Sequence, residues 1–174
     1  MNSPEFLGWL ERITGIDDLL ADNQLFGGGL HQSIAGAFLN VHVDYNIHPS
    51  TKFHRRLNVL VYMNKAWEDE FEGHLELWDF SGNKKRMLEK YAPIFNRCVI
   101  FETNESSFHG HPKPLKTPKG VNRKSIATYY YSRTRPESGN SIEHNTIYIN
   151  TEGMRGQVKR LMSAVKAFAE RIRS

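Results

Sequence analysis

The alternation of apolar and polar residues along the chain predicts a fold built mainly of short β-strands. It is clearest from Arg55 to Met63, where alternate positions are Leu57, Val59 and Val61 on one face and Asn58, Leu60 and Tyr62 on the other. A period of two indicates a strand with one face against a core. The ranges 74–80, 93–102, 108–109 and 123–132 are further predicted strands, and 30–44 reads as a strand pair joined near Ala35-Gly36. Short strands without long helices between them indicate an antiparallel barrel or jelly roll.

Helical periodicity is found towards the two ends of the chain. Residues 4–13 carry apolar side chains at helical spacing, with Pro4 at the start and Gly15 beyond the end. A second short helix is predicted around Asp17 to Leu20, and Gly27-Gly28-Gly29 indicates a tight turn. Residues 153–174 form an amphipathic pattern, which is expected to pack on the barrel or on a partner subunit. The expected organisation is a single domain over 1–174, with an N-terminal helical segment (1–26), a β-rich core (27–150) and a C-terminal helix (153–174).

Composition describes an ordinary globular protein, with 39% hydrophobic and 24% charged residues in 174. No apolar run reaches about 18 residues and no signal pattern opens the chain, so we expect no membrane association. The single cysteine, Cys98, lies in an apolar run and predicts a buried, reduced thiol in a cytoplasmic protein. The net charge of +4 is mostly spread along the chain, which argues against nucleic acid as the main partner.

The candidate chemistry is concentrated in the stretch Val41-His42-Val43-Asp44. Side chains two residues apart on a strand point the same way, so His42 and Asp44 project together. An imidazole nitrogen and a carboxylate oxygen in this arrangement suit two adjacent positions on a divalent metal such as Fe(II). A third ligand would close one face of the metal and leave the opposite face open. His109 offers it, and His111, which would share the same strand face, is its competitor.

The ordered set His42-x-Asp44, His109 and Arg123-x-Ser125 resembles the signature of the Fe(II)/2-oxoglutarate-dependent dioxygenases, in particular their prolyl 4-hydroxylase-like branch. The likeness runs from about Gly27 to Tyr131. It implies a mainly β (α+β) protein with a double-stranded β-helix core of the jelly-roll or cupin-like type and flanking helices, whose ligands point into the barrel mouth. It also favours His109 as the third ligand, which leaves His111 as a pocket group.

The resemblance further implies the co-substrate and the roles of the site residues. Arg123 lies where relatives place the cation that holds the distal carboxylate of 2-oxoglutarate, and its planar fork can grip both oxygens. Ser125 adds a hydroxyl donor on the same face, and Lys124 between them should face outward. Fe(II) bound by His42, Asp44 and His109 would use O2 and 2-oxoglutarate to hydroxylate a C–H bond. Succinate and CO2 would be released, with ascorbate as an auxiliary reductant.

The primary substrate is left open between a prolyl or other peptidyl side chain and a small metabolite. His31, Gln32 and Ser33 are expected near the co-substrate, and the other candidate pocket residues are Tyr45, Asn46, His54, Tyr62, Trp78 and His111. The AlkB-type nucleic-acid demethylases are one alternative, but they carry a second arginine where this chain has Tyr129. A non-catalytic cupin-like metal-binding or interaction domain is the other alternative, against which the intact ligand set argues.

Relatives of this type carry more chain before the His-x-Asp strand than the 41 residues found here. Three explanations are open. The chain is a compact version, a piece of a longer protein, or part of a homo-oligomer in which a neighbouring copy covers an exposed sheet edge.

Overall fold

The computed structural model describes residues 1–81, 85–135 and 142–149. Helix α1 (Pro4–Thr14) precedes the strands, and a short 3-10 helix, η1 (Asp69–Phe71), lies between the fourth and fifth of them. The strands are β1 (Leu20–Ala21), β2 (Gly29–Ser33), β3 (Leu39–Val43), β4 (His54–Tyr62), β5 (Leu75–Asp79), β6 (Arg86–Tyr91), β7 (Cys98–Glu102), β8 (Phe108–His111), β9 (Arg123–Ser132) and β10 (Ile147–Tyr148).

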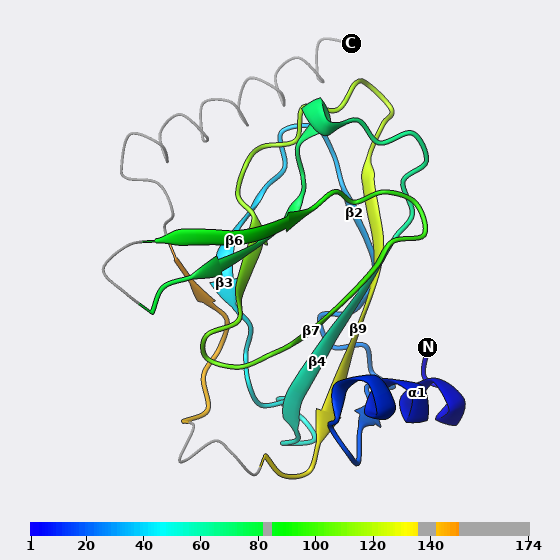
Figure 1. The fold of residues 1–174 in the computed structure, drawn as a ribbon, viewed down its shortest axis with the longest axis vertical. Coiled ribbons are helices and arrows are strands. Elements are labelled where there is room, and N and C mark those ends of the chain that lie inside the picture. Colours follow the sequence, from blue (N-terminus) through cyan, green and yellow to red (C-terminus); the bar gives the residue numbers. More distant parts are fainter. Residues whose placement is uncertain (82–84, 136–141, 150–174) are drawn as a thin grey trace.

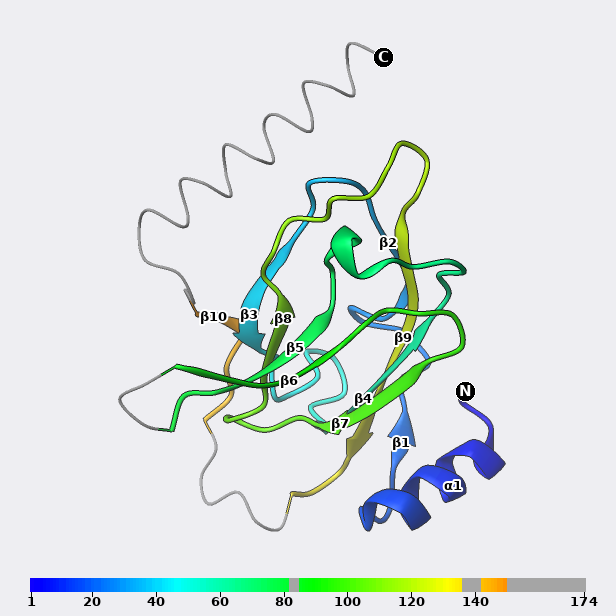
Figure 2. The same ribbon diagram turned by 45° about the horizontal axis from the view of Figure 1, so that its top comes forward.

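These strands form two sheets (Figure 1, Figure 2). The first has the order β1-β9-β4-β7, with β2 also paired to β9, and the second has the order β10-β3-β8-β5-β6. Every pairing between these strands is antiparallel. From β2 onward consecutive strands alternate between the sheets, except that β5 and β6 are neighbours in the second sheet. The predicted jelly-roll core, a double-stranded β-helix, is thereby confirmed.

Strand β4 separates the hydrophobic core from the interior of the barrel. Its residues Leu57 and Val59 point outward and pack with Leu10 of α1, in a buried cluster that Leu19 and Tyr130 complete. Asn58 and Leu60, at the alternate positions, line a cavity between the two sheets. The alternation read from the sequence is therefore confirmed, and the helix covers the outer face of the same strand whose inner face borders the cavity.

Helix α1 has the ends that its sequence predicts. The Ser3 side chain accepts a hydrogen bond from the Phe6 N–H at 3.3 Å, and Pro4 follows in the first turn. Gly15 ends the helix with a φ of 68°, a left-handed conformation that glycine adopts at little cost. The helix is thus fixed in length before it packs on the sheet.

Three local predictions are wrong. Residues around Asp17 to Leu20 form no helix, and Leu20 instead begins strand β1. The strands predicted within 30–44 exist, but β2 pairs with β9 and β3 with β8, so they are not partners of each other. Cys98 is exposed rather than buried, and the residues that follow it, Val99, Ile100 and Phe101, are only partly buried.

Besides β1, two described strands were not predicted, β6 and β10. Strand β6 is exposed at nearly every position and so has no apolar alternation to reveal it. Strand β10 has two residues and pairs Ile147 with Val43 and Tyr148 with His42. It covers the edge of β3 from within the same chain, while the expected homo-oligomer stays a prediction. The predicted helix over 153–174 lies outside the described residues.

Among residues 1–81, 85–135 and 142–149, no helix combines the length and the apolar character needed to cross a bilayer.

We expect Leu10→Ala to lower the free energy of unfolding by about 2–5 kcal/mol, because it leaves a cavity beneath α1 against Leu57 and Val59. Chemical denaturation monitored by circular dichroism measures this loss. Ile13→Ala on the same helix is the matched control, since Ile13 is 52% exposed and its removal should change stability by no more than about 0.5 kcal/mol. Equal losses for the two variants would contradict the packing of α1 described above.

Candidate active site

The structure brings His42, Asp44 and His109 together between strands β3 and β8. The antiparallel register sets His42 opposite His109, with their ring centroids 4.4 Å apart, and Asp44 directly follows β3. The Nε2 atom of His42 lies 3.6 Å from Oδ1 of Asp44, and Nε2 of His109 lies 3.4 Å from Oδ2. One ligand atom from each residue lies within 4.8 Å of the other two. The three predicted ligands therefore meet at one point.

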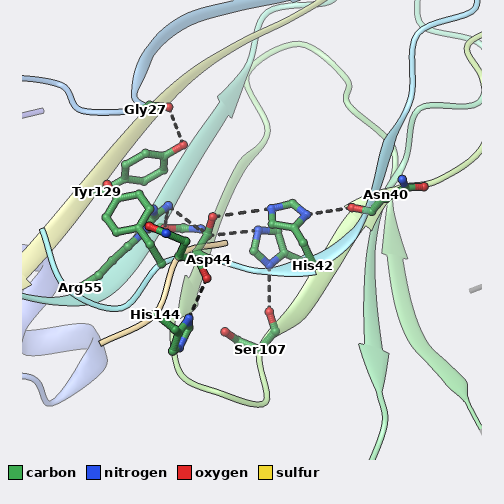
Figure 3. A network of polar contacts seen from close by, with 12 residues as sticks. Gly27, Asn40, His42, Asp44, Arg55, Ser107, Tyr129 and His144 are labelled. Carbon is green, nitrogen blue, oxygen red and sulfur yellow. Dashed lines mark hydrogen bonds and ion pairs between the residues drawn. The ribbon is translucent and has the colours of Figure 1, made fainter. Parts of the chain in front are cut away.

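Each imidazole is oriented by a backbone carbonyl. Nδ1 of His42 lies 2.8 Å from the Asn40 oxygen, and Nδ1 of His109 lies 2.8 Å from the Ser107 oxygen. Figure 3 shows His42 held between Asn40 and Asp44 in this way. A carbonyl oxygen only accepts hydrogen bonds, so Nδ1 carries a proton in both rings. Nε2 of each ring faces the Asp44 carboxylate and is the nitrogen that can bind a metal.

The side chains that meet at this point have the chemistry of a metal-binding site. Burial alone would raise the pKa of the Asp44 carboxyl, but its contact with His42 and the charge of Arg55 hold that pKa well below its ordinary value. Burial lowers the pKa of His109 to about 4, so this ring is neutral near pH 7. A carboxylate facing imidazole lone pairs is the donor set of a divalent transition metal, and two histidines with one carboxylate suit Fe(II). The residues present therefore fit the metal that the sequence predicts.

Two residues hold Asp44 that sequence reasoning did not assign to the site. Arg55 places Nη2 3.0 Å from Oδ2 of Asp44, and the Asn58 amide donates to the same oxygen at 2.8 Å. Both residues belong to the run Arg55-Arg56-Leu57-Asn58, which takes part in the family likeness. Arg55 and Asn58 are three positions apart, and in a regular strand such residues point to opposite faces, so the sequence did not indicate that both reach Asp44.

The cavity between the sheets has a volume of about 460 Å³ and is lined by His42, Asp44 and His109, among other residues. Arg123 and Ser125 line it from β9, and His31, Gln32 and Ser33 line it from β2, all as predicted. Lys124 is exposed, also as predicted. The remaining lining residues are Leu30, Phe38, Leu39, Asn58, Leu60, Leu75, Gly110, His111 and Tyr129.

Arg123 is buried at the cavity wall, and its guanidinium is held in place by hydrogen bonds to Gly73 and Tyr62. Its Nε donates to the Gly73 carbonyl at 2.8 Å, and its Nη2 donates to the Tyr62 hydroxyl at 3.3 Å. The Tyr62 ring also lies 5.0 Å from the guanidinium carbon. A cation that is held in this way, in the same cavity as the histidines, can receive one end of a dicarboxylate whose other end lies at the metal.

His111 lines the same cavity, in agreement with its prediction as a pocket group. Burial lowers its pKa to about 3, and the Arg123 charge acts in the same direction. Within the part of the chain that the structure describes, its Nδ1 atom is buried and has no hydrogen-bond partner. His111 lies outside the cluster formed by His42, Asp44 and His109, which separates the two candidates for the third ligand.

The other predicted pocket residues do not line the cavity, namely Tyr45, Asn46, His54, Tyr62 and Trp78. Tyr62 stands behind Arg123 rather than facing the cavity. Trp78 donates its Nε1 proton to Glu76. Tyr129, noted in the sequence only because it replaces an arginine, is a lining residue. Tyr45 and Asn46 lie in the connection between β3 and β4, where strand alternation gives no information about orientation.

The fold and this site define a class of protein. The family model of the 2OG-Fe(II) oxygenase superfamily matches residues 28–131, so the chain belongs to that superfamily. Membership implies Fe(II) as the metal and 2-oxoglutarate and O2 as co-substrates.

Particular relatives are prolyl hydroxylases. The chain is 26% identical over 136 residues to the prolyl 3-hydroxylase OGFOD1 of Mus musculus; the match covers 76% of this chain but only 23% of that protein. It resembles a prolyl 4-hydroxylase structure from Phytophthora capsici at a TM-score of 0.56 and 16% identity, over 94% of this chain and 50% of that one. A Trichoplax adhaerens prolyl hydroxylase, solved with a hypoxia inducible factor peptide fragment, matches at a TM-score of 0.45 and 26% identity, over 59% and 42% of the two chains.

We expect Gly110→Ala to weaken divalent metal binding and to lower the free energy of unfolding by about 1–3 kcal/mol. A Cβ at Gly110 would lie 2.8 Å from the backbone oxygens of Leu39 and Asn40, so β8 must move away from β3 and carry His109 with it. Titration with Co(II) and thermal unfolding measure the two effects. Gly8→Ala is the control, because the nearest atom to its Cβ lies at 3.7 Å and the metal affinity should not change.

Proposed function

We propose that this protein is a 2-oxoglutarate- and Fe(II)-dependent hydroxylase that acts on a prolyl residue of a peptide or protein. The observation that carries the proposal is the meeting of His42, Asp44 and His109 in one cavity with Arg123. A metal site alone is common to many folds. Here the metal site lies on the second sheet and the Arg123 guanidinium lies on the first, in the same cavity. This arrangement suits 2-oxoglutarate, which can bind a metal through one end and an arginine through the carboxylate at its other end.

In this proposal each residue has one task. His42, Asp44 and His109 hold Fe(II), and Arg123 with Ser125 holds the distal carboxylate of 2-oxoglutarate. The metal supplies the activation of O2 when it is bound. The net reaction joins O2, 2-oxoglutarate and a substrate C–H bond to give succinate, CO2 and the alcohol, so one oxygen atom enters succinate and the other enters the product. The protein orients the reactants and excludes water from them.

Two observations support a peptidyl substrate. The mouse relative is a prolyl 3-hydroxylase, although this chain spans less than a quarter of it. The cavity also borders Leu30, His31 and Gln32, which are exposed on β2, so that a segment of a larger chain can approach it. A free metabolite is the competing substrate class. The cytoplasmic location remains part of the prediction.

The test of the activity is the release of succinate from 2-oxoglutarate by the full chain with Fe(II), O2 and ascorbate. Turnover that depends on Fe(II) supports an oxygenase. Mass spectrometry of proline-containing peptides and of small metabolites incubated with the enzyme then identifies the product that has gained one oxygen atom. No succinate from metal-loaded protein, with or without these substrates, would instead support a non-catalytic metal-binding domain.

We expect His42→Ala and Asp44→Ala to abolish both metal binding and succinate formation, since each removes one of three ligands. Anaerobic titration with Fe(II) measures binding apart from turnover. His54→Gln is the matched control, because His54 lies outside the cavity lining and should leave the affinity as it is. Retention of Fe(II) by Asp44→Ala at the affinity of the unchanged protein would overturn the ligand assignment.

Arg123→Lys is expected to raise the 2-oxoglutarate concentration required for turnover about 10-fold or more, with metal affinity little changed. A lysine keeps the charge but loses the two-pronged contact and the hydrogen bond to Gly73. The measurements are the KM for 2-oxoglutarate and the Co(II) affinity. Lys124→Ala on the exposed face of the same strand serves as the control. An unchanged KM in Arg123→Lys would remove Arg123 from the co-substrate site.

A further inference from the structure

Arg55 is a buried cation that the proposed reaction does not use. Its side chain is 1% exposed, and its Nη2 lies 3.0 Å from Oδ2 of Asp44. The same guanidinium donates from Nε at 3.0 Å and from Nη2 at 2.8 Å to the side-chain oxygen of Asn58. The Asn58 amide nitrogen in turn donates to Oδ2 of Asp44 at 2.8 Å. Arg55, Asn58 and Asp44 therefore form a closed ring of hydrogen bonds.

Two aromatic rings fix the plane of the Arg55 guanidinium. Its central carbon lies 3.6 Å from the centroid of the Tyr129 ring and 4.5 Å from that of Tyr45. Both rings are themselves held, since the Tyr129 hydroxyl donates to the Gly27 carbonyl at 2.9 Å and the Tyr45 hydroxyl lies 2.7 Å from that of Tyr131. Figure 3 shows Tyr129 over Arg55, with Asp44 on the far side of the guanidinium. Arg55 cannot turn away from Asp44 without disturbing these contacts.

A β-bulge makes this arrangement possible. In a regular strand Arg55 and Asn58 would face opposite sides, because they are three positions apart. The pairing of β4 with β9 shifts register between Arg55 and Leu57, so that Arg55 lies opposite Tyr131 and Asn58 opposite Tyr129. Both side chains then point into the barrel. Arg56, within the bulge, donates instead to Ser132 and lines a separate cavity beside α1.

We propose that Arg55 and Asn58 are positioning residues for the Asp44 carboxylate. By donating to Oδ2 they fix the rotation of the carboxylate, which would keep Asp44 in the orientation that a metal held by His42, Asp44 and His109 requires. In that orientation Oδ1 lies 3.6 Å from Nε2 of His42 and Oδ2 lies 3.4 Å from Nε2 of His109. The inference rests on the proposed function, because it requires the metal to be held by His42, Asp44 and His109.

An ion pair that serves only stability is the alternative explanation. A buried ion pair adds little net stability once the desolvation of both charges is included. Stability alone also does not require Arg55 and Asn58 to converge on the same carboxylate oxygen. The two explanations differ in what happens to the metal when the geometry is changed but the charge is kept.

The test compares Arg55→Lys and Asn58→Ala with Arg56→Lys as the matched control, each in the full chain. Arg55→Lys keeps the positive charge and loses the planar fork, and Asn58→Ala removes one donor to Oδ2 without any change of charge. The probe is Co(II) under anaerobic conditions, whose affinity is obtained by titration and whose visible absorption bands report the number and arrangement of its ligands. Thermal unfolding of each variant accompanies the titration.

We expect Co(II) affinity to fall about 10- to 100-fold in Arg55→Lys and in Asn58→Ala, with altered absorption bands in both. Arg56→Lys should show the bands and the affinity of the unchanged protein. Because Arg55 and Asn58 act on one oxygen, the double variant should lose less affinity than the product of the two single losses. Asn58→Ala keeps the test decisive if Arg55→Lys does not fold.

Unchanged affinity and bands in Arg55→Lys and Asn58→Ala would overturn the positioning role, while loss of Co(II) binding in Asp44→Ala would leave the proposed function standing. If Asp44→Ala also binds Co(II) as the unchanged protein does, the metal site itself is refuted. The two failures are therefore distinguishable from the same set of titrations.

Discussion

Asp44 keeps its negative charge where only 12% of its side chain is exposed. Charges in such surroundings cost several kcal/mol unless partners compensate them. Arg55 supplies a compensating positive charge, and Nε2 of His42 and of His109 faces the same carboxylate. The elements that carry these four residues therefore have to hold them at fixed positions.

Strand β4 links this local problem to the stability of the whole domain. Its outward residues form the core beneath α1, and its inward residues Asn58 and Leu60 belong to the cavity. Strand β9 behaves in the same way, with Tyr130 in the core and Arg123, Ser125 and Tyr129 at the cavity. Helix α1 therefore packs on the outer faces of the two strands whose inner faces line the cavity. Weaker packing of α1 would shift these strands and the cavity residues they carry, although no residue of α1 lines the cavity.

Much of the fold and the site could be predicted because strong local signals carry them. The alternation of β4, the caps of α1 and the His-x-Asp pair each follow from spacing of residues along one element. The failures arose where the outcome depends on a partner element. Strand β6 is recognised only by its pairing with β5, and the roles of Arg55 and Asn58 depend on a bulge set by β9. Cys98 is exposed because β7 is the outer strand of its sheet, and an apolar run does not reveal this.

Strand β10 has a consequence for where this catalytic unit ends. The family model stops at residue 131, but Ile147 and Tyr148 pair with β3, and the Tyr148 ring lies 5.4 Å from that of His42. Cutting the chain at the family boundary would remove this cover from β3, which carries His42 and leads directly into Asp44, and would expose the backbone edge of β3 to other chains. The unpaired backbone N–H and C=O groups of an exposed edge strand can pair with strands of neighbouring molecules, which leads to aggregation. A minimal fragment for crystallisation or engineering must therefore include residues 147–149, or its aggregation would be mistaken for a property of the whole protein.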